Sequence, residues 1–126
     1  MSCADVCIDM DVNVYNDFYC ETQRKAQKPH ICCECRETIK PGKDYWHAVG
    51  KSEGDIWTAK TCAVCYEVRR TFVCGSWEFG GLWQAIRDVL FPSWDVSGPI
   101  DCLAKVETLE ARNKLRKEYA DYKETT

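Results

Sequence analysis

The hydrophobic and polar positions of residues 44–60 follow the alternating pattern of two β-strands. Residues 44–49 and 56–60 are rich in aromatic and β-branched side chains, and a polar stretch that contains Gly54 separates them. Such a stretch between two strand-like runs is typical of a turn. We therefore expect the two strands to pair as a β-hairpin.

Helical spacing follows directly after this hairpin. Thr61 is a good N-cap residue, and a helix is predicted to begin at about residue 62. The residues at positions i, i+3, i+4 and i+7, which would form its buried face, are Cys65, Val68, Arg69 and Phe72. Strands followed by helices predict an α+β fold.

Two more helices are predicted in the C-terminal part of the chain. Residues 79–91 carry apolar side chains at helical spacing, and Pro92 is expected to end this helix, with Trp94 in the loop that follows. Residues 101–123 are rich in strong helix formers. We expect this last helix to pack on the domain, so that the chain is a monomer; a weak dimer through the same helix is the alternative.

The most informative motif is a set of two Cys-x-x-Cys pairs, Cys32–Cys35 and Cys62–Cys65, with 26 residues between them. Four thiolates at such spacings are typical ligands of one structural Zn²⁺ ion. A knuckle with the first pair, then a hairpin, then a helix that begins at the second pair is the arrangement of a small treble-clef zinc finger. His30 and Cys33 could replace Cys32 and Cys35, although the turn at residues 39–42 follows Cys35 more naturally. Two disulfides or a redox-active Cys-x-x-Cys are less favoured alternatives.

Further cysteines leave a second metal site open. Cys3 and Cys7 have a plausible spacing for two ligands, and Cys74 lies just past the zinc helix, where the N-terminal segment could meet it. The alternative is that these thiols are small apolar side chains of the core.

Composition limits the domain organisation. The chain has 126 residues, ten of them cysteines, and a formal net charge of −3. This length is that of one domain, which we divide into an acidic N-terminal arm docked on the core (1–28), the zinc unit (29–73) and a helical C-terminal part (74–126). No secretory signal, lipidation signal or long apolar run is found in the sequence, so we expect a reducing cytoplasm and no membrane partner.

Charge and aromatic residues suggest two kinds of partner. Residues 23–70 hold ten bases and six acids, which leaves local contact with nucleic acid open. The candidate contacts are Arg24, Lys25, Lys28, Arg69 and Arg70. Five tryptophans are many for this length, and Trp46, Trp57 and Trp83 are candidates for a protein interface, with core packing as the alternative.

Catalysis has little support in the sequence. Treble-clef nucleases use a strand histidine together with a second one on the helix, and here His47 has no such companion after Cys62. We therefore expect no enzyme activity and no catalytic residues, with a degenerate treble-clef nuclease as the third hypothesis.

The region of residues 13–90 resembles a largely uncharacterised group of small zinc-binding proteins encoded by bacteriophages and prophages. The similarity is carried by Lys28-Pro29-His30, Cys32-Cys33-Glu34-Cys35, Ile39-Lys40-Pro41-Gly42 and Thr61-Cys62-Ala63-Val64-Cys65. Two departures are Arg36, where a knuckle usually has glycine, and the Trp46-His47 pair. The resemblance implies an infected bacterial cytoplasm, where small accessory proteins bind host proteins, including those of defence systems. The expected function is thus a non-enzymatic zinc protein that binds a host protein, with a nucleic-acid-binding accessory protein as the alternative.

Overall fold

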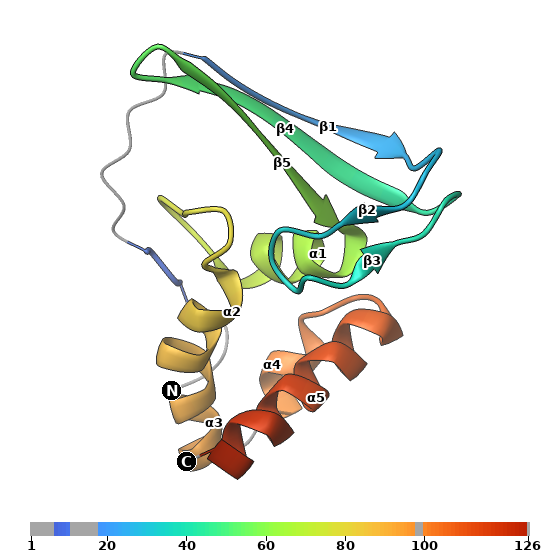
Figure 1. Cartoon of the computed structure of the whole chain (residues 1–126). Coiled ribbons are helices and arrows are strands. Elements are labelled where there is room, and N and C mark those ends of the chain that lie inside the picture. The colour runs from blue at the N-terminus through green and yellow to red at the C-terminus, as the bar shows by residue number, and fades with distance from the viewer. Residues whose placement is uncertain (1–6, 11–17, 98–99, 126) are drawn as a thin grey trace.

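The computed structural model describes residues 7–10, 18–97 and 100–125, with only the backbone of 96–97 and 100–101. Three strands form an antiparallel sheet in the order β1–β4–β5: β1 (Phe18–Lys25), β4 (Asp44–Ser52) and β5 (Asp55–Cys62). The predicted hairpin is confirmed as β4 and β5. Strand β1 was missed, because the sequence predicts only a docked arm there. Two short strands, β2 (His30–Ile31) and β3 (Thr38–Ile39), pair beside this sheet (Figure 1).

The strand register assigns the side chains to two faces of the sheet. Glu21, Ala48 and Ala59 stand opposite one another on one face. Trp46, on the same face, stacks on Tyr66 of α1 (Ala63–Phe72), with ring centroids 3.8 Å apart. Helix α1 therefore covers this face, and its N-terminus lies at the end of β5.

The other face of the sheet is open. Figure 1 shows the described helices on the opposite side. Three rows of side chains cross this open sheet face, namely Phe18, Lys51 and Ile56; Cys20, Val49 and Thr58; and Thr22, His47 and Lys60. Six of these nine residues are exposed and the other three are half-buried. Among the described residues, this sheet face is therefore exposed to solvent.

Helix α1 confirms the predicted helical spacing, with one change at its start. Its buried residues are the four predicted ones, Cys65, Val68, Arg69 and Phe72. The N-cap is Cys62 rather than Thr61, because the Cys62 sulfur accepts a hydrogen bond from the Cys65 backbone N–H. Thr61 remains in β5 and is fully buried.

The second helical segment is longer than predicted. It runs through α2 (Leu82–Ala85), the π-turn η2 (Ile86–Leu90) and α3 (Phe91–Ser97), so the prediction that Pro92 ends the helix is wrong. The π-turn shifts the hydrogen bonding by one residue, since the Phe91 N–H donates to Ile86 O, and Pro92 then lies in the first turn of α3, where a missing N–H is tolerated. Trp94 is buried in α3 instead of lying in a loop.

The single C-terminal helix that the sequence predicts is divided into α4 (Ile100–Ala104) and α5 (Leu109–Thr125). Thr108 caps α5, because its Oγ1 accepts a hydrogen bond from Ala111 N. The Glu67 carboxylate of α1 accepts hydrogen bonds from the Glu107 and Thr108 backbone N–H groups at 2.8 and 3.0 Å. The break thus orients α5 against α1, where Ala111 and Leu115 are buried, as expected for a helix that packs on the domain.

The core joins the zinc unit to the C-terminal helices. Buried side chains of α1, α2 and α5 belong to one hydrophobic cluster, which also includes Ile8, Cys32 and Tyr45. The coarse α+β prediction is therefore confirmed. Among the described residues, no helix is both long and apolar enough to cross a membrane.

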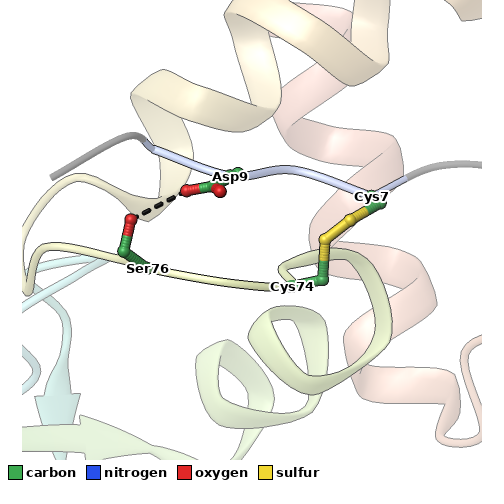
Figure 2. Close-up of a disulfide and its surroundings, with 4 residues drawn as sticks. All are labelled: Cys7, Asp9, Cys74 and Ser76. Carbon is green, nitrogen blue, oxygen red and sulfur yellow. Dashed lines mark hydrogen bonds between the residues drawn. A yellow bond between two sulfur atoms is a disulfide. The ribbon is translucent and has the colours of Figure 1, made fainter.

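The N-terminal segment contributes to this core through residues 7–10. Ile8 N donates to Phe72 O and Cys74 N donates to Ile8 O, both at 2.9 Å. Figure 2 shows the two segments side by side, with a Cys7–Cys74 disulfide at one end and a hydrogen bond between Asp9 and Ser76 at the other. Cys102 of α4 is disulfide-bonded as well. These bonds differ from the expectation that the cysteines would be free or metal-bound thiols.

Removal of the Cys7–Cys74 disulfide is expected to lower the free energy of unfolding by about 2–4 kcal/mol, because the bond closes a long loop in the unfolded chain. The measurement is chemical denaturation of the Cys7→Ser/Cys74→Ser variant without reductant. Cys20→Ser, which replaces an exposed free cysteine, is the control and should change stability little. Equal stability of the double variant and the unmodified chain would contradict this account.

Candidate metal centre

The four cysteines of the two Cys-x-x-Cys pairs meet at one point of the fold. Cys32 and Cys35 lie on the turn between β2 and β3, Cys62 ends β5, and Cys65 lies in the first turn of α1. Their sulfur atoms all lie within 4.8 Å of one another. Cys32 and Cys65 are fully buried and the other two are half-buried. The hairpin thus brings together two pairs that are far apart in the sequence.

The sulfur–sulfur distance that joins the two pairs is compatible with tetrahedral coordination of an ion. A Zn–S bond of about 2.3 Å places the sulfurs of a regular tetrahedron about 3.8 Å apart. The Cys35 and Cys62 sulfurs are 3.9 Å apart. Four cysteine sulfurs would fill all four positions of a tetrahedrally coordinated ion and leave none for water or substrate.

Hydrogen bonds orient the sulfurs toward this point. The Cys32 sulfur accepts from Glu34 N at 3.4 Å and from Cys62 N at 3.3 Å. The Cys65 sulfur accepts from the indole N–H of Trp83 at 3.3 Å. Such donors stabilise thiolates, as does the N-terminus of α1 at which the second pair lies.

The four thiols also influence one another's ionisation. Hydrogen bonds from Cys35, Cys62 and Cys65 lower the pKa of the Cys32 thiol. The hydrogen bond between Cys65 and Cys32 raises the pKa of the Cys65 thiol. Four sulfurs this close therefore cannot all ionise on their own, because their negative charges repel one another. A divalent ion held by these four cysteines would supply positive charge and favour their thiolate forms.

The alternative ligands lie outside the cluster. The His30 ring packs against Tyr45, with centroids 5.1 Å apart. The Cys33 sulfur lies 3.6 Å from Thr61 Oγ1, and burial raises the pKa of its thiol. Arg36 adopts φ +63°, the left-handed conformation for which a knuckle usually has glycine, and its N–H donates to Cys32 O at 3.1 Å. The knuckle therefore closes in spite of that departure.

Within the described chain, these four cysteines are the one group of metal-ligating side chains that meets at ligand distance. No protein-family model, curated protein or solved structure matches this chain. The role of the centre therefore has to be inferred from its own geometry.

The second metal site that the sequence suggests is not formed by Cys7 and Cys74. The structure brings the two residues together, as the hypothesis requires, but as a disulfide. A sulfur bonded to another sulfur is not a thiolate and does not act as this type of ligand. Cys3, the third candidate, lies outside the described residues.

The candidate nucleic-acid contacts fall into two groups. Arg24, Lys25 and Lys28 line one cavity together. The prediction that Arg69 contacts nucleic acid is wrong, since this residue is 5% exposed and pairs with Glu21 at 2.6 Å. Arg70, exposed on α1, lies 5.9 Å from the Tyr66 ring and does not line the cavity.

The tryptophans predicted to form a protein interface pack largely against other residues of the chain. Trp83 is 8% exposed and packs against the metal centre, so its assignment to an interface is wrong. Trp46 and Trp57 are half-buried. Trp57 lies across Gly50, where any side chain would overlap the indole ring. Both rings belong to the covered face of the sheet, and the open face carries other residues.

Sequence reasoning missed Glu34, which lies between the ligands of the first pair. Its Oε1 accepts hydrogen bonds from Gly80 N at 2.8 Å and Leu82 N at 3.2 Å, at the start of α2. Burial raises the pKa of this carboxyl group, while the two N–H donors oppose the shift. Glu34 thus links the metal centre to the C-terminal helices. A partner 46 residues away leaves no local signal in the sequence.

Proposed function

We propose that this chain is a non-enzymatic binding protein built around one structural zinc ion in a treble-clef unit. The support for zinc is the closed set of four sulfur donors at tetrahedral spacing. Catalytic zinc sites keep one position for water, and four cysteine ligands leave none. The ion would therefore stabilise the fold rather than carry out a reaction.

The observation that carries the binding proposal is the apolar end of the open sheet face. Phe18 is 54% exposed and Ile56 is 74% exposed. They stand on either side of Lys51 in one row across the three strands. Exposed large apolar side chains on an uncovered sheet face favour a protein interface. The rigid sheet beneath them keeps the patch in one shape.

The partner class follows from the resemblance to phage-encoded zinc proteins. In that setting we propose a host protein as the partner, for instance one of a defence system. Recognition would combine burial of Phe18 and Ile56 with contacts from Lys51, which lies between them, and from Thr58 in the adjacent row.

The test is a pull-down of the tagged chain from bacterial lysate, with and without nuclease, read by mass spectrometry. We expect one stoichiometric protein that survives nuclease treatment. The Phe18→Ser/Ile56→Ser variant should lose at least about 2 kcal/mol of binding free energy if these residues are interface hot spots. Leu109→Ser is the matched control, because Leu109 is 65% exposed on α5, away from the sheet. Equal loss in both variants, or no retained protein, would refute the proposal.

A further inference from the structure

Basic side chains gather at the other end of the open sheet face, near the metal centre. A cavity of about 730 Å³ is lined by Arg24, Lys25, Lys28, Lys60, His30 and His47. The remaining described lining residues are a glutamine and a tyrosine, so no carboxylate of the described residues faces this basic cavity. Its formal charge is therefore positive throughout.

The sheet register fixes the centre of the cavity. His47 of β4 stands opposite Lys60 of β5 and opposite Thr22 of β1. Arg24 lies two residues after Thr22 and hence on the same face. Arg24, His47 and Lys60 come from three hydrogen-bonded strands, so their spacing does not depend on a loop.

Within the part of the chain that the structure describes, no acid pairs with the lysine and arginine residues of the cavity. Asp44 stands opposite Lys25, so the register assigns both residues to the covered face, whereas Arg24, His47 and Lys60 lie on the open face. Like charges held together without an acid destabilise one another unless an anion binds between them.

The His47 imidazole also lies among positive charges. Its Nδ1 atom is buried and has no hydrogen-bond partner among the described residues. Burial lowers the pKa of the imidazole, and Arg24, Lys60 and His30 lower it further. A bound anion would relieve the repulsion.

We propose that the basic cavity is a binding site for phosphate groups, carried by a single-stranded nucleic acid or by a free polyphosphate. Lysine and arginine side chains around an open cavity suit the several charges of such a ligand, and the flat sheet leaves room for its uncharged part. The site is separate from the Phe18–Ile56 patch, and it does not depend on the protein partner proposed above.

The test uses the zinc-loaded full chain with two probes, a fluorescent single-stranded oligonucleotide and unlabelled inorganic tripolyphosphate. Fluorescence anisotropy at low salt should show binding of the oligonucleotide. In Arg24→Gln/Lys60→Gln the affinity should fall at least about tenfold, and the slope of log affinity against log salt should flatten by about 1.4, the value for two lost phosphate contacts with a single strand.

Lys51→Gln is the matched control, since it removes one positive charge from the same sheet face outside the cavity. It should change affinity less than twofold. Displacement of the oligonucleotide by tripolyphosphate would support a polyphosphate site, and its retention would support a nucleic-acid strand. The His47 imidazole resonances should shift with either bound probe in NMR spectra. Absence of binding at low salt, an equal loss in Lys51→Gln, or unmoved His47 resonances would overturn the proposal.

Discussion

Cys62→Ala is expected to abolish metal binding and cooperative folding of the zinc unit. Cys62 ends β5, caps α1 and supplies one of the four sulfurs, so its loss opens the cluster at the junction of sheet and helix. Binding of a structural zinc ion contributes about 10–16 kcal/mol to small zinc-finger peptides at neutral pH. Domains of this size are stabilised by only about 5–15 kcal/mol in total. The zinc unit should therefore unfold without its ion.

The measurement is zinc content together with circular dichroism during thermal unfolding. Cys33→Ala is the matched control, because Cys33 is adjacent to a ligand but its sulfur faces Thr61. This variant should keep its zinc and a cooperative transition. A chelator added to the unmodified chain should reproduce the Cys62→Ala result. A folded and zinc-loaded Cys62→Ala variant would show that the four cysteines are not the ligands.

The second large effect is expected at the buried ion pair between α1 and β1. Arg69 and Glu21 are 2.6 Å apart, with side chains only 6% and 12% exposed. The Arg69 guanidinium also lies within 5.0 Å of the ring centroids of Tyr66 and Trp77. Glu21→Leu leaves this charge buried without its partner, which costs about 3–5 kcal/mol in comparable pairs. Chemical denaturation measures the loss.

A double variant separates the charge from the packing. Glu21→Leu/Arg69→Met removes both charges, and we expect it to recover most of the stability that Glu21→Leu loses, since apolar replacement of a buried pair is often close to neutral. The control is Lys123→Met, which breaks a more exposed pair with Asp95 and should cost no more than about 1 kcal/mol. A double variant no more stable than Glu21→Leu would contradict this account.

Local patterns explain why part of the fold could be predicted from the sequence. The Cys-x-x-Cys pairs, the turn between β4 and β5, and the buried face of α1 depend on residues a few positions apart. Strand β1 escaped prediction because one face of it is open, so most of its side chains are exposed and the alternation is lost. Its most buried residue, Glu21, is charged and reveals its role only beside Arg69.

Contacts between distant segments account for the other differences. The break between α4 and α5 depends on Glu67, which lies 40 residues before the backbone that it binds. Val89, an apolar residue of the π-turn, is 47% exposed although residues 79–91 were predicted as a helix with an apolar face. The metal centre could be predicted residue by residue, whereas its links through Trp83 and Glu34 could not.

The most direct test of the central claim is X-ray absorption at the zinc edge on the purified, metal-loaded chain. Four cysteine ligands predict four sulfur neighbours at about 2.3 Å and no nitrogen or oxygen in the first shell. That result would establish the closed site on which the structural role of the ion depends. A first shell that contains nitrogen or oxygen, or a chain that retains no zinc, would contradict it.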